Sequence, residues 1–448
     1  MLNAIFHFLT GLDEFFWGYV AFGLIIVLGS YLTIKNKFFQ IREFPSIAKS
    51  FFQFMKGGES ERGVHPLRAF FASAGGMIGI GNVVGIVTAV QLGGPGALFW
   101  VWMAGMIGAI VKYGEIYLGL KYRVPNDRGG YDGGPMYFLK AAFKKTRFLP
   151  ILAALLLCIY GVEIYQFTVI TDSVSSNWEI NRFLVIAVLL GLVVYAGLGG
   201  VKRLGKICSW MMPIFMVVYS LMALWIIGQE ITALPVILAG VFKSAFTGQA
   251  AIGGFAGASV ILAIQHGIAR AAYSGDIGIG YDSIIQAESS TIYPERQARL
   301  AILGIFIDNL VCTMSILMVL VTGVWKAAEP IQGSHLVQVA LSHYFPMMDL
   351  FMPLFLIFCG YTTIIAFFVV GLKCARYLMP RRGTAIFTCY AMSTFVLFTF
   401  VNQTRTLLVM SIAGAMLLII NIIGIYRLRH EIVFSSEAEG IEARPVTD

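Results

Sequence analysis

The stretch GGMIGIGNVVGIVTAVQLGGP, residues 75–95, decides how this chain is expected to fold. It lies inside a long apolar segment, yet glycines recur through its first three helical turns. Each glycine costs a helix roughly 0.8–1 kcal/mol relative to alanine, and lipid offers the freed backbone groups no water partner. We therefore predict an interrupted helix here. At membrane depth a break is tolerated only where protein or a water-filled cavity satisfies the backbone, so it marks a polar binding site.

The composition indicates an integral membrane protein with one transmembrane domain. Of the 448 residues, 58% are hydrophobic and only 12% are charged, against about 25% charged in soluble domains. The excess of 32 basic over 24 acidic residues lies in short loops between apolar segments, which indicates membrane orientation rather than nucleic-acid binding. The six cysteines form no CxxC pair, so neither a disulfide framework nor a zinc site is expected.

Apolar runs predict an all-α fold with about eleven transmembrane helices, since about 20 apolar residues cross roughly 30 Å of hydrocarbon. Basic residues follow the odd-numbered spans, which places the N-terminus outside the cell membrane and the tail, residues 428–448, in the cytoplasm. The expected spans cover residues 15–34, 65–90, 97–120, 149–172, 183–199, 208–228, 234–270, 297–325, 347–378, 384–401 and 405–427.

The spans divide into one extra helix, 15–34, and two sets of five, 65–228 and 234–427. Each set begins with a glycine-broken segment, and the two start on opposite sides of the membrane, which predicts an inverted-topology repeat. The second break is expected in GGFAG, residues 253–257. The two breaks would face each other, with substrate-binding positions at Gly79, Ile80, Gly81 and Asn82 and at Gly253, Gly254 and Phe255.

Broken helices suit a zwitterion and a cation, because half-helix N-termini attract a carboxylate and unwound carbonyls bind Na⁺. The alternative is that spacings such as Gly75-xxx-Gly79 only allow close helix packing.

Several polar residues at membrane depth are further candidates. Glu163 and Gln166, three residues apart, are expected on one helical face, where Glu163 could hold the substrate amine, help to bind a cation, carry a proton or pair with a basic residue. Lys112 and Glu115 are interpreted as a mutually neutralising pair near the cytoplasmic end. Thr362 and Thr363 could bind Na⁺ or bond their own helix. The role of Asp308 stays open, and His266 is expected to be a packing residue.

Sequence motifs typical of enzymes are absent or incomplete. The sequence contains no HExxH or GxSxG, and the glycine-lysine stretch at 200–206 resembles a phosphate loop but ends in Ile207 and follows no strand. We therefore expect no enzyme and no cofactor beyond a coupling ion.

The quoted residues resemble the alanine/glycine:cation symporters, also called sodium:alanine symporters. The resemblance rests on GIGNVVGIVTAVQLGGPGALFWVW (79–102) and continues through YDGGPMYFL (131–139), Gln166, GGFAG (253–257), GIAR (267–270), GIFID (304–308) and TTII (362–365). It implies a leucine-transporter-type fold and uptake of small neutral amino acids, L- or D-alanine and glycine, with Na⁺ or, less often, H⁺.

Carried over by residue, the resemblance implies a substrate site at Gly79, Gly81, Asn82 and Gln166 and a sodium site near Thr362 and Thr363. This chain departs from the family pattern at four places. The GTGN threonine is Ile80, the SNEAG loop is SGDIG at 274–278, the span-9 tryptophan is Phe367, and Glu163 replaces an uncharged residue. The expected function is Na⁺-coupled symport by alternating access; the alternative is an H⁺-coupled carrier of a different small amino acid or amine, with Glu163 as proton acceptor.

Overall fold

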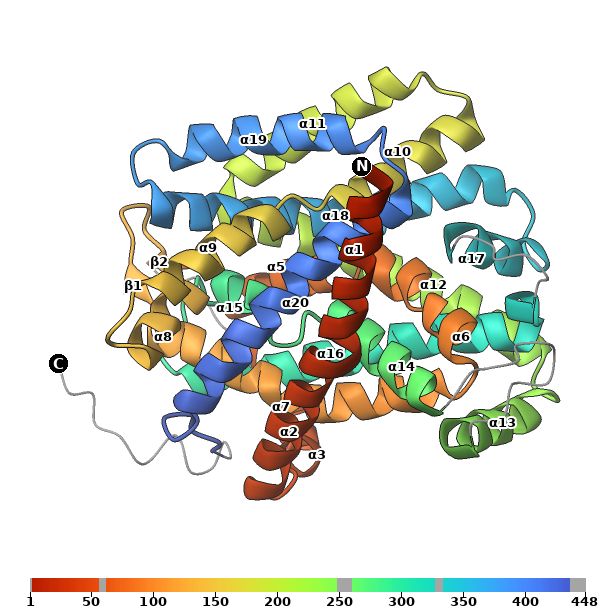
Figure 1. Cartoon of the computed structure of the whole chain (residues 1–448), viewed down its shortest axis with the longest axis horizontal. Coiled ribbons are helices and arrows are strands. Elements are labelled where there is room, and N and C mark those ends of the chain that lie inside the picture. Colours follow the sequence, from red (N-terminus) through yellow and green to blue (C-terminus); the bar gives the residue numbers. More distant parts are fainter. Residues whose placement is uncertain (1, 56–61, 248–259, 327–332, 436–448) are drawn as a thin grey trace.

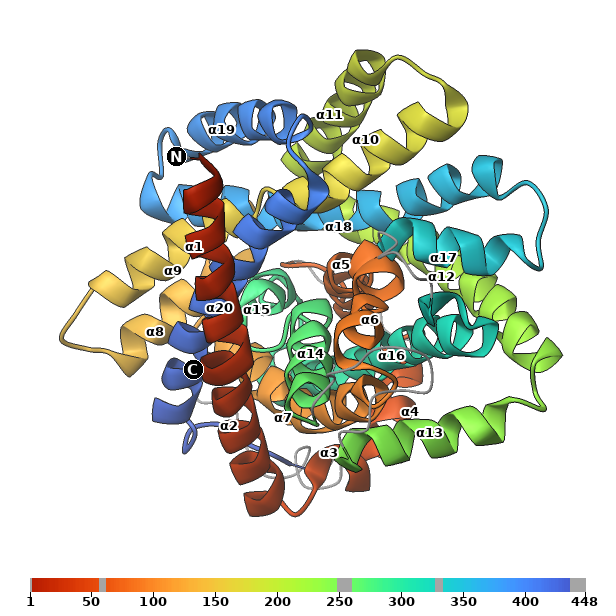
Figure 2. The same ribbon diagram turned by 45° about the vertical axis from the view of Figure 1, so that its right-hand side comes forward.

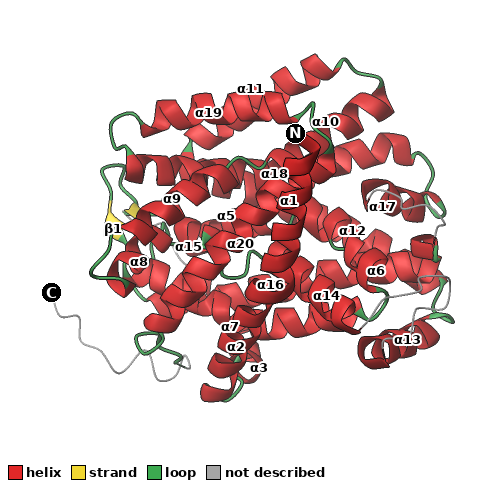
Figure 3. Cartoon of the chain, viewed as in Figure 1, coloured by secondary structure: helices red, strands yellow, loops and turns green. Residues whose placement is uncertain are grey.

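The computed structural model describes residues 2–55, 62–247, 260–326 and 333–435. Across these residues the chain is almost wholly helical, and its one sheet is the antiparallel hairpin of β1 (Val124–Pro125) and β2 (Tyr131–Asp132). Figure 3 shows this hairpin at the edge of an otherwise helical molecule.

The first half of the chain forms the extra N-terminal helix, the first broken span and the helices that follow it. Its elements are α1 (Leu2–Phe15), η1 (Phe16–Ala21), α2 (Phe22–Lys35), α3 (Phe39–Arg42), α4 (Phe44–Phe54), α5 (Pro66–Met77), η2 (Gly81–Gly85), α6 (Thr88–Gly93), α7 (Ala97–Lys121), α8 (Pro135–Ala142), α9 (Phe148–Tyr160), α10 (Ile164–Trp178), α11 (Arg182–Leu198) and α12 (Gly200–Gln229).

The second half of the chain also contains an interrupted span and several long helices. Its elements are α13 (Leu234–Thr247), α14 (Val260–Ser274), α15 (Tyr281–Gln286), α16 (Pro294–Thr322), η3 (Val324–Lys326), α17 (Gly333–Ser342), α18 (Met348–Leu378), α19 (Gly383–Phe398) and α20 (Gln403–Arg427).

Helix starts follow ordinary capping chemistry. Pro66 and Pro294 stand in the first turns of α5 and α16, where a missing N–H costs no intrahelical hydrogen bond. Asn181 and Asn402 cap α11 and α20, each accepting a hydrogen bond from the backbone N–H two residues later. Local sequence therefore sets where these helices begin.

Among the described residues, seven helical stretches are long and apolar enough to cross a membrane, and the bent pair formed by α5 and residues 81–93 brings the number to eight. Three shorter apolar helices, α11, α13 and α19, accompany them. The predicted all-α membrane architecture is confirmed, whereas the count of eleven spans stays a prediction. The extra helix, expected at 15–34, extends over residues 5–35.

The broken elements lie in the middle of the molecule. Figure 2 shows α5, α14 and α15 at the centre, with α7, α16, α18 and α20 around them. In contact terms, α7 packs along α16 and α14, while α18 packs along α9, α10 and α12. Figure 1 places α8 and the β-hairpin at one end of the molecule and α13 and α17 at the other.

The outer surfaces are apolar, as a bilayer requires. Phe183 of α11, Trp210 of α12 and Val236 of α13 are among many large hydrophobic side chains that are more than half exposed. In water such surfaces would be unfavourable, whereas in lipid they contact hydrocarbon. The central polar residues described next are buried by contrast.

Candidate functional site

The predicted first break is present. α5 ends at Met77, Ile78 is extended, and the chain resumes as η2 at Gly81, bent by 44° from α5. The backbone N–H groups released by the break find side-chain partners: Gly79 donates to Asn82 Oδ1 at 3.0 Å, and Ile80 donates to Gln166 Oε1 at 3.2 Å. Protein side chains thus supply what lipid cannot.

A second break lies between α14 and α15, over residues 275–280. The backbone adopts positive φ at Asp276, Gly278 and Gly280, which ends one helix and turns the chain into the next. The predicted second break, at Gly253, Gly254 and Phe255, lies outside the described residues. The glycine-rich run GDIGIG at 275–280 was the signal for the break seen here, and sequence analysis used it only as a family loop.

A third break separates α9 from α10, and sequence analysis missed it. Glu163 does not share a helical face with Gln166, as predicted, because it precedes the helix. It is the N-cap of α10, and its carboxylate accepts a hydrogen bond of 3.3 Å from the Gln166 backbone N–H. This interaction satisfies one of the donors that a helix start leaves free. The interpretation of a shared face is therefore wrong, although both residues are buried.

Asp308 of α16 joins the first two breaks. Its carboxylate accepts hydrogen bonds from the Asn82 side-chain amide and, at 3.1 Å, from the hydroxyl of Ser274, the last residue of α14. The Asn82 carbonyl in turn accepts a hydrogen bond of 2.8 Å from Ser315. The structure thereby gives Asp308, whose role the sequence left open, a place between the two interrupted helices.

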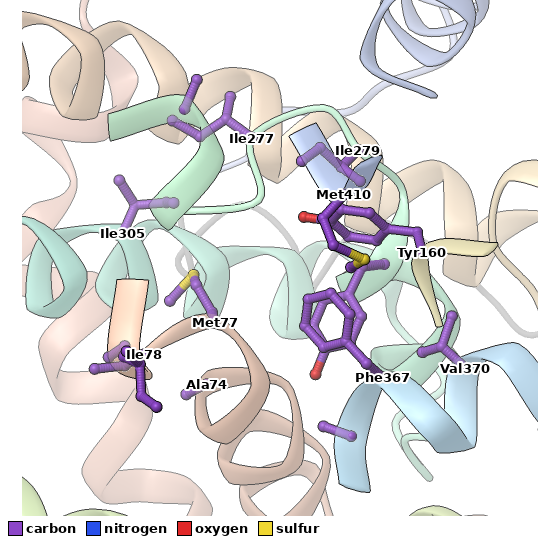
Figure 4. Packing of buried hydrophobic residues seen from close by; sticks show 14 of the residues in the cluster. Ala74, Met77, Ile78, Tyr160, Ile277, Ile279, Ile305, Phe367, Val370 and Met410 are labelled. Atoms are coloured by element: carbon purple, nitrogen blue, oxygen red, sulfur yellow. The ribbon is translucent and has the colours of Figure 1, made fainter. Parts of the chain in front are cut away.

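Aromatic rings close one side of this region. The ring of Phe367 in α18 stacks on that of Tyr281, with the two centroids 4.5 Å apart. The centroid of the Tyr160 ring lies 5.0 Å from that of Phe367. Figure 4 shows Tyr160 and Phe367 beside Met410, with Met77 across from them. Phe367 therefore lies beside the second and third breaks.

The two threonines of α18 differ in their contacts. Thr362 donates to the carbonyl of Cys359 at 2.9 Å, within its own helix. Thr363 also reaches the carbonyl of Gly75 in the last turn of α5, at 3.2 Å. Thr363 thus links α18 to the end of the first half-helix, where backbone carbonyls and a negative partial charge gather.

Lys112 and Glu115 do not form the predicted pair. The Lys112 ammonium forms its ion pair with Asp282 of α15, a residue 170 positions later in the chain. Spacing along α7 made a pair with Glu115 possible, but the chain outside α7 supplies a better-placed carboxylate. His266 lies in the middle of α14, where it lines a cavity between α1, α14 and α20.

Two cavities flank the centre without reaching it. One of about 820 Å³ lies between α1, α14 and α20 and is lined by residues that include Asp13 and Arg270. The other, of about 770 Å³, is lined by residues that include Lys373 and Arg376 of α18. Between them Asn82, Glu163 and Gln166 are at most 8% exposed. The centre is therefore closed to both sides.

No group of three or more His, Cys, Asp or Glu side chains suited to a metal ion occurs among the described residues. Oxygen atoms from broken helix ends and from Thr363 are the hard donors that Na⁺ accepts. The polar groups at the centre are thus backbone groups at the breaks and the side chains of Asn82, Gln166 and Thr363.

Comparison with known proteins agrees with this architecture. An uncharacterized transporter of Haemophilus influenzae is 32% identical over 435 residues, covering 95% of this chain and 94% of that protein. The sodium/alanine symporter AgcS of Methanococcus maripaludis is 31% identical over 440 residues, covering 95% of each.

Among solved structures, that of MhsT in complex with L-phenylalanine matches with a TM-score of 0.52 at 14% identity, covering 81% of this chain and 89% of that one. This likeness shows the leucine-transporter-type fold. The model of the sodium:alanine symporter family matches residues 2–438. With that match along nearly its whole length, the chain belongs to the sodium:alanine symporter family, whose members are cation-coupled transporters and not enzymes.

Proposed function

We propose that this protein imports small neutral amino acids, L- or D-alanine or glycine, by Na⁺-coupled symport with alternating access. The observation that carries the proposal is the meeting of two interrupted helices around Asp308, which brings Asn82 and Ser274 to one carboxylate. Such a centre offers backbone donors to a substrate carboxylate and oxygens to a cation. The name of the Methanococcus maripaludis relative, a sodium/alanine symporter, supports the same substrate class.

In this proposal the substrate binds along the first break. Gly79, Ile80, Gly81 and Asn82 supply backbone and amide groups, and the Gln166 side chain, already bonded to the Ile80 N–H, orients them. The remaining proposed substrate contacts are Glu163, Gly253, Gly254, Phe255 and Phe367.

Space at this break favours a small substrate. A methyl group added at Gly79 would lie 2.3 Å from Thr363 Oγ1 and 2.8 Å from Gln166 Oε1, so the backbone is tightly enclosed. The bulk of Ile80 and Phe367 adds to this enclosure.

The proposed Na⁺ site lies at the end of α5. Thr363 already contacts the Gly75 carbonyl there, and Thr362 stands beside it on α18. Both threonines would bind the ion together with backbone oxygens. We propose that the first repeat, 65–228, and the second, 234–427, lie on the two sides of this centre. The N-terminus would lie outside the cell and the tail from residue 428 in the cytoplasm.

Uptake into proteoliposomes tests the proposal. Full-length protein should accumulate alanine or glycine from a panel of D- and L-amino acids only with an inward Na⁺ gradient, and unlabelled substrate inside should speed exchange. Accumulation that is indifferent to Na⁺, or uptake of none of these amino acids, would contradict it. Thr363→Ala should raise the Na⁺ concentration for half-maximal uptake at least tenfold, while Thr394→Ala, on the exposed side of α19, leaves it unchanged.

One observation favours a second candidate, an H⁺-coupled carrier. The Glu163 carboxylate is 2% exposed, and no basic side chain among the described residues forms an ion pair with it. A buried carboxylate without such a partner is suited to carrying a proton. Glu163→Gln separates the candidates, because glutamine can still accept the hydrogen bond from the Gln166 N–H but cannot take up a proton. Na⁺-driven uptake should survive this change, whereas uptake driven by a pH gradient should be lost.

A further inference from the structure

The Lys112 side chain lies in an oxygen cluster on the far side of the second break. Lys112 is in the middle of α7, and the residue is 1% exposed. Its ammonium donates hydrogen bonds to the carbonyl oxygens of Gly275 at 2.8 Å and Asp276 at 2.7 Å, and it forms an ion pair with Asp282. Two carbonyl oxygens and a carboxylate thus face one positive charge.

These oxygens belong to the two ends of the second break. Gly275 and Asp276 directly follow α14, where the carbonyl groups at a helix C-terminus carry negative partial charge. Asp282 lies in the first turn of α15 and also accepts a hydrogen bond from Ser73 of α5. One ammonium therefore holds α14, α15 and, through Asp282, α5 against α7.

The donor set is the kind that a hard metal cation uses. Carbonyl and carboxylate oxygens are the usual protein ligands of such ions. A buried carboxylate and helix end without a cation would be strongly unfavourable, because removing one partner of a buried ion pair leaves an uncompensated charge. The lysine meets this requirement permanently, since it is covalently attached to α7.

We infer that Lys112 is a tethered cation that fixes the second break and fills a position that would otherwise bind a metal ion. Lys112 is thus a positioning residue, distinct from the proposed Na⁺ site at Thr363. Removal of the amine leaves the cluster of Gly275, Asp276 and Asp282 open to a soluble monovalent cation. This behaviour does not depend on the identity of the transported substrate.

The test uses Lys112→Met, which keeps most of the length of the unbranched side chain and removes the terminal amine with its charge. Melting of the purified full-length protein is followed in choline chloride and in rising NaCl at constant ionic strength, without amino acid. The variant should melt below the wild type in choline, and Na⁺ should raise its melting temperature by roughly 2–4 °C more than it raises that of the wild type. Lys206→Met, the same change at an exposed position of α12, should respond as the wild type does.

Asp282 supplies the second arm. The double variant Lys112→Met/Asp282→Asn removes both charges, so it should melt above Lys112→Met in choline and lose the additional Na⁺ response. This arm also covers a Lys112→Met protein that does not fold, because the double variant should then be recovered while the single one is not.

Two results overturn the inference: a Na⁺ response of Lys112→Met equal to that of the wild type, or a double variant no more stable than Lys112→Met. Absence of Na⁺-driven uptake in the wild type would instead contradict the proposed function. The two failures are therefore distinguishable.

Discussion

A single glycine shows how tightly the centre is packed. A methyl group at Gly76 would lie 1.6 Å from the Tyr281 hydroxyl and 2.4 Å from its ring. Tyr281 cannot move aside easily, because it is fully buried and stacks on Phe367. Close approach of α5 to this ring therefore requires glycine at position 76.

Gly76→Ala should consequently abolish alanine uptake and lower the melting temperature, since the clash lies with a fixed ring rather than with a flexible side chain. Gly85→Ala is the matched control: a methyl group there meets nothing within 4 Å, and alanine stabilises a helix by roughly 0.5–1 kcal/mol. Uptake and thermal melting of the two proteins provide the comparison. Normal transport by Gly76→Ala would show that Tyr281 is not held as described.

Asp308 offers a second test at a single residue. Asp308→Ala leaves the Asn82 amide and the Ser274 hydroxyl without their shared acceptor, at a cost of roughly 1–3 kcal/mol for each buried group. We expect loss of uptake and a lower melting temperature. Asp308→Asn retains one acceptor oxygen, so it should fold better than the alanine variant. Equal stability of the two variants would exclude the bridging role.

At the scale of helices, the sequence predicted the first break and missed the two at 275–280 and before α10. Gly75 to Gly85 placed the first break correctly, because several glycines in one apolar segment leave little alternative. The break at 275–280 was not predicted, and the predicted break at Gly253 and Gly254 lies outside the described residues and stays a prediction. Glycine density alone could not show which run faces the first break, since that depends on contacts between distant segments.

The break before α10 illustrates a different limit. The sequence around it contains one glycine, Gly161, and otherwise reads as a continuous apolar helix. The break coincides with a close approach of two backbones: a methyl group at Gly161 would lie 2.7 Å from the Cα of Gly371 in α18. Tertiary contact therefore overrides local helix preference here, and Glu163 caps the helix that restarts.

Lys112 and Glu115 give a prediction at this same scale. Exchanging them, Lys112→Glu with Glu115→Lys, keeps the composition of α7 but turns a carboxylate toward the carbonyls of Gly275 and Asp276. We expect little folded protein and no uptake, because like charges then face each other in a buried place. A mutually neutralising pair would tolerate the exchange, so normal expression and transport would revive the original interpretation. Expression level, melting and uptake are the measurements.

Across the whole molecule, apolar length predicted the membrane class correctly, and charge distribution predicted an orientation that stays a prediction. Both follow from the bilayer itself, which imposes the same rules on every chain. Ion pairs between distant segments could not be read in this way, since their partners are far apart in the sequence. Lys373, for example, bonds Glu288 at 2.6 Å, Asp132 at 2.9 Å and the Tyr131 carbonyl at 2.8 Å.

These contacts join α18 to the β-hairpin and to the segment after α15, so we expect them to hold this face of the molecule closed. Lys373→Met should speed backbone hydrogen exchange in residues 124–132 and 288–293, because the cross-links between these segments are lost. Lys202→Met, in the same cavity, is the control. Hydrogen-exchange mass spectrometry makes the comparison, and unchanged exchange in Lys373→Met would show that other contacts keep this face shut.

Orientation can be tested independently. Cysteine introduced at His7 should react with an impermeant maleimide added to intact cells, whereas cysteine at Lys202 should react only in inverted vesicles. The expectation follows from the excess of basic residues on one side of the membrane. The reverse pattern would invert the direction in which the proposed symporter works.

The three interrupted helices have an evolutionary consequence. Where a solute is bound largely by backbone peptide groups, substitutions seldom abolish its binding, because every amino acid carries the same main chain. In the proposed site, selection is then free to alter side chains near the breaks, such as Ile80, Glu163 and Phe367, and so to change which substrate is accepted. Proteins with such a scaffold can evolve different substrate ranges while the fold stays the same.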